Sequence, residues 1–541
     1  EFNFQKILEE ERKYSPGVAD FTARLSTNQP VNKCFIGEAV LLSPFFLIAY
    51  TLSHLLGYDT GGYGLLFQVF VSIGALFYLA FGLIYLRKLI KLYTVSEFAT
   101  GLTIILVVFA TNLFNYATIE PSMSHVYSFG FMAFFLFHLK KSIDEFKTKN
   151  LLWLTVAITI LVLIRPTNLL GIFFIPFFAG SIKNSISFIV KFFKNKNILV
   201  FFLVAGAILS IQFIIWYAET GRFFIWSYPG EGFNFLRPRY IYILFSYCKG
   251  WFLYTPLMLM TLLGGFFTYR RNRFLFLSVL FFFLLITYVL SSWSSWWYGG
   301  SFGLRAFIDF YPAFALLLAI TLDSFTSLWL QVPFTIGCFM CLYLNQVQTY
   351  QYTHSILPID SMNKNRYWKI FLKTDHAYVG IFENLNTDNY NYFTRYYFSN
   401  DFEHNTWGYN DNISTNFAQS GTHSAFVDQQ HQYSPALVLK ASELPQAKPL
   451  YIYVKVWVYM PDFNNDAEIV ASLQDDKGAC LLWRTRFLQG FVFERNLWTQ
   501  AYALIKLPEL NNPDDVLKVY VLNTKNIVYI DNMEVTFGTP K

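Results

Sequence analysis

The chain has 541 residues, of which 54% are hydrophobic, 20% are aromatic and only 14% are charged. That composition predicts a polytopic membrane protein with room for an additional soluble domain. The net charge of +6 is modest, and the basic residues cluster in short loops between apolar runs. We therefore interpret them as membrane-orientation signals, which argues against a nucleic-acid partner. The five cysteines are scattered and predict neither a zinc site nor a disulfide framework.

Residues 1–35 are polar, and a first apolar segment follows at residues 36–56. Because the chain begins at Glu1 and shows no signal peptide, we expect that a natural N-terminal segment, such as a first transmembrane helix, precedes it. The later apolar runs predict about ten or more transmembrane helices in all. These runs are residues 65–86, 98–114, 126–139, 151–164, 169–178, 198–217, 251–267, 274–290, 313–322 and 328–344.

The connections between the apolar runs differ in charge. Those rich in lysine or arginine, which the positive-inside rule places in the cytoplasm, are residues 87–91, 140–149, 183–196 and 270–273. The connections that then lie on the external side are residues 116–124, 165–168, 219–249 and 291–312. This alternation also predicts that the C-terminal part of the chain is external.

After about residue 350 the long apolar runs stop, and short alternating segments separated by Pro, Gly, Asn and Asp begin. That pattern predicts an antiparallel β-sandwich. We therefore expect a polytopic α-helical membrane domain at residues 1–350, a linker at 351–395 and an all-β sandwich of the jelly-roll type at 396–541.

The external connection 291–312 combines Trp296, Trp297 and Tyr298 with three glycines and a lone Arg305. A guanidinium close to hydrocarbon needs an anion, and glycines let the backbone approach a ligand. These residues predict a pocket for a lipid phosphate or sugar phosphate. The alternative is an interfacial aromatic belt with a snorkelling arginine.

The other external connections carry further candidate site residues. Glu120 is a candidate general base or metal ligand, and the alternative is that it caps the helix that begins near Ser122. His125 is a candidate ligand contact, or else makes a hydrogen bond inside the core. Arg165 is a candidate phosphate contact, or else an interfacial anchor.

Two regions give weaker signals for the same site. The long connection of residues 216–249, with Arg237 and Arg239, either covers a substrate or is a structural lid. Lys33 either contacts an anion or snorkels to the interface. The sequence contains no P-loop, dinucleotide fingerprint or nucleophile elbow, and no internal repeats, so ATP-driven and secondary transport are disfavoured.

The order of these segments resembles the membrane-embedded type C glycosyltransferases, which include protein O-mannosyltransferases and aminoarabinose transferases. The resemblance covers roughly residues 1–345 and rests on KCFIGEA at 33–39, EPSMSH at 120–125, RPTN at 165–168 and WWYGGSFGLR at 296–305. Such enzymes move a sugar from a polyprenyl-phosphate carrier to an acceptor outside the cytoplasm. The resemblance therefore implies a bacterial inner-membrane protein with a periplasmic C-terminal domain, and it places residues 36–56 in the outer interface.

By this resemblance, Lys33 and Arg305 contact the carrier phosphate, and Glu120 is an external acidic residue of the site. The catalytic acid of the family lies early in the first external loop, and Asp20 is the only aspartate in residues 1–35. Glu120 and Asp20 are thus the candidate catalytic residues. A divalent metal in the membrane site is a further expectation.

The C-terminal region resembles carbohydrate-binding, galactose-binding-like jelly rolls. That resemblance implies a structural calcium ion near Glu403 and Asp531. We thus expect a glycosyltransferase that uses a polyprenyl-phosphate-linked sugar in the lipid bilayer, with a protein, lipid or glycan acceptor. The alternative is a non-catalytic membrane subunit of an envelope protein complex, whose sandwich binds a glycan or a protein.

Overall fold

The computed structural model describes two compact units, one formed by Glu1–Thr353 with Leu372–Thr374 and one by His354–Phe371 with Asp375–Lys541. Within these bounds, the residues whose structure is described are 22–24, 30–228, 231–262, 272–325, 327–354, 356–359, 362–375, 378, 390–404, 407, 411–462, 464–488, 491–492, 495–510 and 512–540. Asp20 lies outside the described residues.

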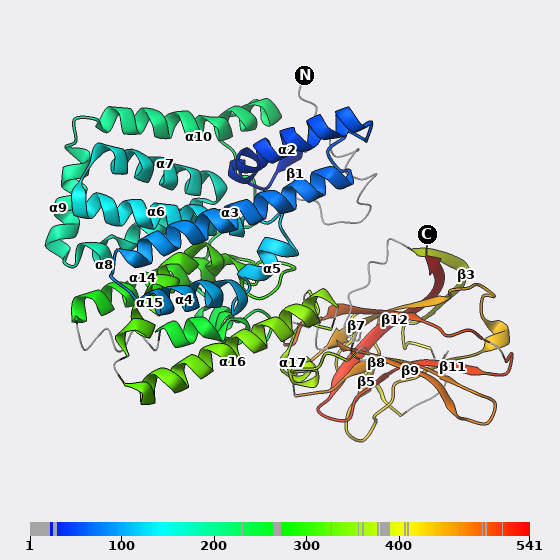
Figure 1. Ribbon diagram of the computed structural model, residues 1–541. Coiled ribbons are helices and arrows are strands. Elements are labelled where there is room, and N and C mark those ends of the chain that lie inside the picture. Colours follow the sequence, from blue (N-terminus) through cyan, green and yellow to red (C-terminus); the bar gives the residue numbers. More distant parts are fainter. Residues whose placement is uncertain are drawn as a thin grey trace. The chain divides into compact units, whose positions relative to one another are not determined.

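The first unit is helical (Figure 1). A small hairpin of β1 (Thr22–Arg24) and β2 (Pro30–Asn32) precedes the helices. The helices are α2 (Gly37–Leu56), α3 (Leu65–Lys91), α4 (Glu97–Phe109), α5 (Leu113–Thr118), α6 (His125–Glu145), α7 (Thr148–Ile164), η1 (Pro166–Phe174), α8 (Ile175–Ala179), α9 (Ile182–Phe193), α10 (Ile198–Thr220), α11 (Tyr240–Phe245), α12 (Trp251–Tyr254), α14 (Arg273–Ser291), η2 (Arg305–Phe310), α15 (Tyr311–Ser324) and α16 (Leu328–Thr353).

Six of the described helices are long and apolar enough to cross a membrane, which makes the chain a multi-pass membrane protein. They are Gly37–Leu56, Leu65–Lys91, Ile198–Thr220, Arg273–Ser291, Arg305–Ser324 and Leu328–Thr353. The apolar helices Glu97–Phe109, Thr148–Ile164 and Pro166–Ala179 are shorter. The expected ten or more spans, and the interfacial position of residues 36–56, stay predictions.

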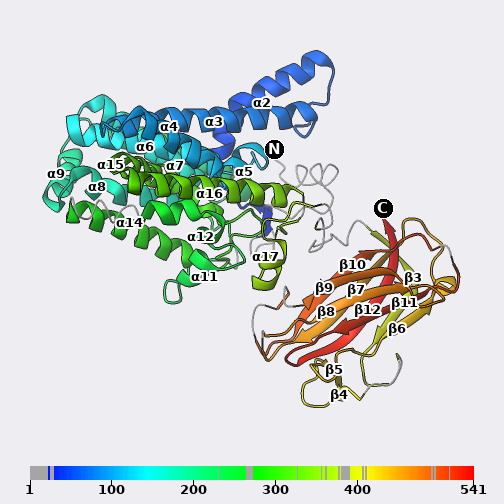
Figure 2. The same cartoon turned by 60° about the horizontal axis from the view of Figure 1, so that its bottom comes forward.

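The bundle has a central layer and a lipid-facing periphery. The window of Arg305–Ser324 is 89% buried, whereas that of Ile198–Thr220 is only 11% buried. α6 packs between α3 and α7, and glycines allow a close approach there, because a Cβ on Gly82 would lie 2.8 Å from the Cα of Gly130. Helices α3, α6, α7 and α10 run side by side in Figure 1, and Figure 2 shows α3, α6 and α7 together from another side.

The two kinds of connection lie at opposite ends of the bundle. The basic end includes the last turn of α3, the last turn of α6, the whole of α9 and the first residue of α14. At the other end α6 begins with His125, α7 ends before Arg165 and η2 begins with Arg305. This other end is called the site end below. Which side of a membrane each end faces stays a prediction.

The second unit contains two antiparallel sheets, which confirms a β-sandwich-like C-terminal region. One sheet has the strand order β10-β7-β12-β5-β4, with β3 also paired to β12, and the other has the order β6-β11-β8-β9. The strands are β3 (Tyr390–Asn400), β4 (Ile413–Ser414), β5 (Ser424–Val427), β6 (Leu437–Lys440), β7 (Tyr451–Tyr459), β8 (Glu468–Gln474), β9 (Cys480–Phe487), β10 (Thr499–Lys506), β11 (Val516–Leu522) and β12 (Val528–Pro540).

Alternation along the strands builds the core of this unit. On β7, Ile452, Val454 and Val456 are fully buried, while the residues between them are partly exposed. A short helix, α17 (Lys364–Ile370), and the start of β3 lie within residues 351–395, where the sequence predicts a linker. The Nη2 atom of Arg366 in α17 donates to the carbonyl of Phe487, so α17 is attached to the sandwich unit.

Candidate functional site

A buried charged group lies at the site end of the helical unit. The Nδ1 atom of His125 lies 2.8 Å from Oδ1 of Asp309, and the two side chains are only 3% and 1% exposed. The Nη1 atom of Arg165 lies 3.0 and 3.2 Å from the two ring nitrogens of His125 and 3.6 Å from Oδ2 of Asp309. A buried carboxylate is costly unless it is paired, so the imidazole and the guanidinium stabilise Asp309.

Sequence reasoning did not select Asp309. It lies in η2, in the segment RAFIDF, where every residue from Ala306 to Phe310 is buried. The signal that identifies it is an acid inside an apolar stretch next to a predicted span, since such a residue needs a partner. Sequence reasoning did select His125 and Arg165, and the structure brings these two together.

Arg305 is the first residue of η2 and is partly exposed. Its Nη1 atom contacts the Sδ atom of Met123 at 3.1 Å, and no carboxylate in the described ranges lies within ion-pair distance of it. Arg165 and Arg305 both lie within electrostatic range of His125 and Tyr298. The guanidinium carbon of Arg165 is also 6.0 Å from the ring centroid of Tyr298. Two cations therefore lie near the same pair of side chains, and Arg305 has no carboxylate partner among the described residues.

The loop before η2 is held in an unusual backbone conformation. Tyr298, Gly299 and Gly303 have φ values of 57°, 70° and 58°. The hydroxyl of Tyr116 accepts from the N–H of Phe302 and donates to its carbonyl, at 3.0 and 3.2 Å. A Cβ on Gly303 would lie 3.1 Å from Tyr254, so glycine serves both the positive φ and the close approach.

The aromatic side chains of this loop pack within the protein. Trp296 is 8% exposed and lies 5.6 Å, centroid to centroid, from Tyr242. Trp297 makes an edge contact with Trp296 at 6.0 Å, and the Tyr298 hydroxyl donates to the Leu290 carbonyl at 3.1 Å. These contacts position the loop. Ligand binding by Trp296, Trp297 and Tyr298 stays a proposal.

Lys33 forms an ion pair with Glu231, with 3.1 Å between Nζ and Oε1. This pair links the N-terminal segment to the long connection of residues 216–249. The thiol of the neighbouring Cys34 lies within electrostatic range of Lys33, Arg165 and Arg305. Three cations therefore lie near Cys34. Cys34 itself is exposed.

Glu120 is held by two side chains rather than capping a helix. Its Oε2 accepts from Nδ2 of Asn115 at 3.2 Å, and its Oε1 accepts from the Tyr352 hydroxyl at 2.7 Å. The cap position of α6 is Ser124, and no side chain caps that helix. The capping alternative for Glu120 is therefore not observed. Tyr352 lies in the last turn of α16, so Glu120 fixes this helix at the site end.

Glu38 is a second acid near the site, to which the sequence analysis assigns no role. It lies in the first turn of α2 and within electrostatic range of Arg165 and Cys34. Its place depends on Gly37, because a Cβ there would lie 2.4 Å from the backbone of Leu163 and Ile164. No hydrogen-bond partner of the Glu38 carboxylate is present in the described part of the chain.

Arg237 and Arg239 are exposed residues of the long connection of residues 216–249. The backbone N–H of Arg239 donates to the carbonyl of Ser291 at 3.0 Å, which ties the loop to the end of α14. Among the described residues, neither guanidinium contacts Arg165, His125 or Asp309. The structure therefore does not join these two arginines to the buried charged group.

The described acids and histidines do not fit the expected metal ions. No three His, Cys, Asp or Glu side chains gather there as a metal-binding group. At the site end, the Asp309 carboxylate is already paired with His125 and Arg165. We therefore assign no metal to this site and derive no step through one.

The calcium expectation fails for a related reason. Glu403 accepts hydrogen bonds from the N–H groups of Thr422 and His423, both at 2.6 Å, and these lower its pKa together with the His423 ring, which has the largest effect. Asp531 accepts from the N–H groups of Gln419 and Ser420 at 2.8 and 3.1 Å. N–H donors occupy the positions that a cation would need, so neither carboxylate fits a calcium ligand.

The sandwich carries a second candidate surface on the face of β3, β12, β7 and β10 that points away from the core. Tyr392 of β3 lies 5.5 Å from Tyr453 of β7, which lies 6.3 Å from Tyr502 of β10. Gly538 of β12 pairs with Tyr392, and a Cβ there would lie 3.0 Å from that ring. Glycine therefore lets rings from strands that are not neighbours meet in one row.

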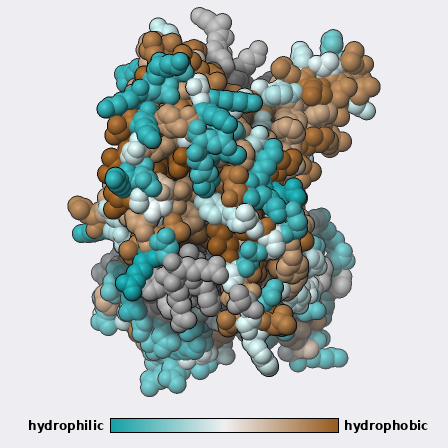
Figure 3. Space-filling model, turned by 60° about the vertical axis from the view of Figure 1, so that its left-hand side comes forward, coloured by the Kyte–Doolittle hydropathy of each residue, from teal (hydrophilic) through white to brown (hydrophobic). Residues whose placement is uncertain are grey.

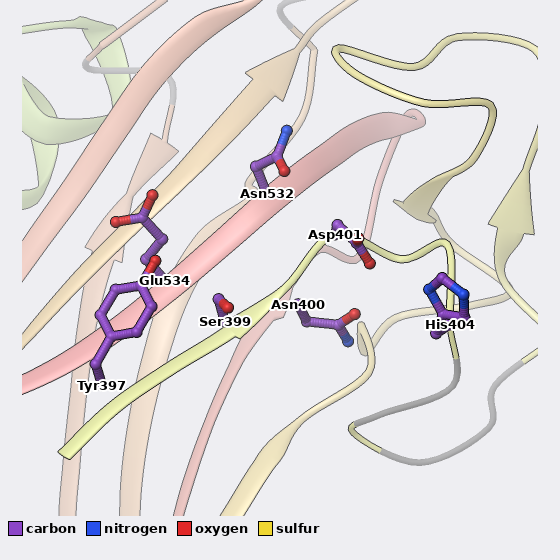
Figure 4. A pocket seen from close by; sticks show the side chains of 7 residues that line it. All are labelled: Tyr397, Ser399, Asn400, Asp401, His404, Asn532 and Glu534. Carbon is purple, nitrogen blue, oxygen red and sulfur yellow. The ribbon is translucent and has the colours of Figure 1, made fainter. Parts of the chain in front are cut away.

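Beside this row lies a hollow of about 440 Å³ with polar walls (Figure 4). Tyr397 and Glu534 stand at one end of it and His404 at the other. Its lining residues are Tyr397, Ser399, Asn400, Asp401, His404, Asn532 and Glu534. Aromatic rings next to hydrogen-bonding groups suit a ligand with both apolar faces and hydroxyls.

Comparison with known proteins gives only distant likenesses. No family model and no curated protein match the chain. Similar solved structures include the family 22 carbohydrate-binding module of Clostridium thermocellum Xyn10B (16% identity, 24% of this chain and 79% of that chain, TM-score 0.16) and the CBM22-1 xylan-binding domain of Paenibacillus barcinonensis Xyn10C (9%, 29% and 89%, 0.16). Arabinosyltransferase EmbB of Mycobacterium smegmatis has 10% identity over 86% of this chain and 57% of that chain, with a TM-score of 0.32. Values this low carry no argument about function.

Proposed function

We propose that the helical unit is a membrane-embedded glycosyltransferase that moves a sugar from a polyprenyl-phosphate carrier to an acceptor hydroxyl. The observation that carries this proposal is the presence of Arg165 and Arg305 near the same side chains at one end of an apolar bundle, with Arg305 lacking a carboxylate partner among the described residues. A guanidinium beside hydrocarbon requires an anion. A phosphate on a long apolar chain supplies that anion and also matches the lipid-facing helices around it.

In this proposal the sugar is transferred in one displacement step, and the cations of the site stabilise the leaving phosphate. The acceptor oxygen forms a bond to the anomeric carbon of the sugar, the bond from that carbon to the phosphate oxygen breaks, and its electron pair leaves with the phosphate. The acceptor proton passes to a carboxylate. Negative charge grows on the leaving phosphate, where Arg165, Arg305 and Lys33 stabilise it. A single inverting displacement needs one base only.

Glu38 is the stronger candidate for that base. It lies near Arg165 and Cys34 with no hydrogen-bond partner in the described residues, whereas both carboxylate oxygens of Glu120 accept hydrogen bonds. Asp309 is taken up by His125. Glu120 therefore positions α16, and Glu38 takes the proton. Asp20, outside the described residues, stays a third candidate.

Transfer assayed with purified full-length protein in liposomes tests the proposal. With a polyprenyl-phosphate sugar donor, Arg305→Ala should lower turnover roughly 10²-fold or more, because each charged contact to a developing oxyanion contributes about that much. Arg222→Ala, on the exposed external loop, is the matched control and should keep full turnover. Equal turnover of the two variants would refute the assignment of the site.

Donor binding can be followed separately through Cys34, which is exposed beside the three cations. In a Cys480→Ser background, which removes the other exposed cysteine, a polyprenyl phosphate should slow maleimide labelling of Cys34. A membrane-impermeant maleimide applied to sealed cells tests whether the site end is external, as the positive-inside rule predicts. Unchanged labelling at saturating lipid would argue against binding there.

A second candidate function is glycan binding by a non-catalytic subunit of an envelope complex. The row of Tyr392, Tyr453 and Tyr502 beside the polar hollow favours it. Stacking of sugar rings on tyrosines with hydrogen bonds from the hollow would give such binding. Tyr453→Ala should then abolish retention of the full-length protein on a glycan array, while Arg305→Ala should leave it unchanged. Retention without any transfer activity would favour this function over the first.

A further inference from the structure

Helix α9 lies across the ends of the long helices at the basic end of the helical unit (Figure 1). Ser181 caps it by accepting from the N–H of Asn184 at 3.1 Å. Phe188 packs against Phe146 at the end of α6, with 6.1 Å between ring centroids, and Phe192 stacks on Phe201 of α10 at 5.7 Å. The helix is thus fixed by one face only.

The rest of α9 has two further faces of opposite character. With 3.6 residues per turn, one stripe gathers apolar side chains that remain exposed, namely Ile182 (65%), Ile186 (56%), Ile189 (41%) and Phe193 (59%). A separate stripe gathers Lys183, Ser187, Lys191 and Lys194, all exposed, and Lys196 follows the helix. Figure 3 turns this end of the unit toward the viewer and shows hydrophilic and hydrophobic side chains interleaved on it.

The lysines of α9 differ from other lysines at the same end. Lys141 and Lys147 both pair with Glu145, at 3.0 and 2.8 Å, and Lys91 pairs with Glu97 at 2.9 Å. In the described part of the chain no acid lies within ion-pair distance of the four lysines of α9 and its C-terminal end. Their exposed ammonium groups are therefore available to an anion of another molecule.

We propose that α9 lies in the headgroup layer of the bilayer leaflet at the basic end and binds the phosphate groups of anionic phospholipids. The exposed apolar stripe enters the boundary of the acyl chains, and the lysine stripe stays among the headgroups. The two stripes lie about 130° apart on the helix, which suits a helix lying in the plane of the interface. A bilayer is the partner that presents an apolar layer and a layer of negative charge together. This interaction is independent of the transfer reaction.

Lipid binding to delipidated full-length protein in detergent, counted by native mass spectrometry, tests the charged stripe. Phosphatidylglycerol should bind more tightly than phosphatidylcholine, and each Lys→Ala change at 183, 191, 194 and 196 should weaken it about fivefold at low salt. The matched control, Lys140→Ala with Asp144→Ala, removes an ion pair of zero net charge at the same end and should leave phosphatidylglycerol binding unchanged. Equal effects of the two sets, or competition by millimolar inorganic phosphate alone, would overturn the proposal.

The depth of the helix gives a second measurement that does not depend on affinity. A single cysteine is introduced at position 186, 187 or 193 in a Cys34→Ser and Cys480→Ser background and labelled with a fluorophore. Each labelled protein is then placed in nanodiscs that contain nitroxide-labelled lipids. Quenching by acyl-chain nitroxides should be strong at 186 and 193 and weak at 187. Equal quenching at all three positions would show that α9 does not lie in the interface.

Discussion

The Nδ1 atom of His125 lies 2.8 Å from Oδ1 of Asp309, although 184 positions separate the two residues in the chain. This contact joins the first residue of α6 to η2, and Arg165 at the end of α7 lies over it. Three segments that are distant in sequence therefore meet in one buried charged group. Its formation fixes the entrance of the central helix α15 relative to α6 and α7.

Loss of the Asp309 carboxylate should be strongly destabilising. Asp309→Ala leaves His125 and Arg165 without their buried counter-charge, and removal of one partner from a buried pair typically costs about 3–5 kcal/mol. We expect a large fall in the melting temperature of the purified protein in detergent, measured by intrinsic fluorescence. Asp309→Asn should fall between this variant and the natural chain because the amide retains the size and one acceptor.

The control for this prediction is Asp144→Ala at the basic end. Asp144 pairs with Lys140 on the surface of α6, and its side chain is 41% exposed. An exposed pair with a spacing of four residues contributes only about 0.3–0.5 kcal/mol. A fall in stability as large as that of Asp309→Ala would show that burial is not the cause.

Gly37→Ala should separate α2 from the end of α7. The added Cβ would lie 2.4 Å from the backbone of Leu163 and Ile164, which cannot yield as a flexible side chain does. Overpacking of this kind costs about 1–3 kcal/mol, and it should also move Glu38 away from Arg165 and lower transfer activity. Gly101→Ala in α4 meets nothing within 4 Å and should raise stability by up to about 1 kcal/mol. Thermal melting and turnover of both variants measure the difference.

Tyr352→Phe should distinguish a positioning role of Glu120 from a catalytic one. The variant removes the donor to Oε1 of Glu120 and should lower stability by about 1 kcal/mol. If Glu120 only positions α16, turnover and its pH profile should stay unchanged, while Glu38→Gln should abolish transfer. A shifted pH profile in Tyr352→Phe would instead assign the base to Glu120.

Hydropathy predicted the helical unit well, and its errors have a physical cause. The sequence predicts an apolar run at residues 126–139, whereas α6 continues to Glu145. Its last turns carry Lys140 and Lys141, which pair with Asp144 and Glu145 at a spacing of four residues. Charged side chains that stabilise a helix thus resemble a polar loop in a hydropathy profile. Strand alternation in the sandwich is a local signal of period two, so that fold was predictable as well.

The candidate site was predictable only in part. The pattern of polar connections between apolar runs identified His125, Arg165 and Arg305 as candidate site residues, because each interrupts an apolar region. Sequence alone could not pair them, since a contact such as that between His125 and Arg165, 40 positions apart, depends on helix packing. Asp309 escaped because it lies among apolar residues of the connection at residues 291–312, and Glu38 because it lies in the apolar segment at residues 36–56. The expected calcium ligands failed because backbone N–H groups, which carry no sequence signature, occupy both carboxylates.

The amide protection of the loop around Thr422 in the sandwich should be lost at low pH, and this loss should depend on Glu403. Hydrogen bonds from the His423 ring, from the N–H groups of His423 and Thr422 and from the Thr422 hydroxyl lower the pKa of Glu403 from 4.5 to about 2. A carboxylate whose pKa is lower in the folded state stabilises that state above its unfolded value, and the contribution is lost as the pH falls through the folded value. Protection of the Thr422 and His423 amides should therefore be full above about pH 4.5 and disappear toward pH 2.

Hydrogen exchange of the full-length protein, corrected for the pH dependence of intrinsic exchange, measures this protection. Glu403→Ala should show weak protection at every pH, because it removes the carboxylate oxygen to which both amides donate. Calcium or a chelator should leave the exchange of residues 419–424 unchanged, since N–H groups already hold Glu403 and Asp531. Slower exchange on addition of calcium would show that the loop rearranges to bind the ion, and the assignment of these carboxylates as purely hydrogen-bonded would then be wrong.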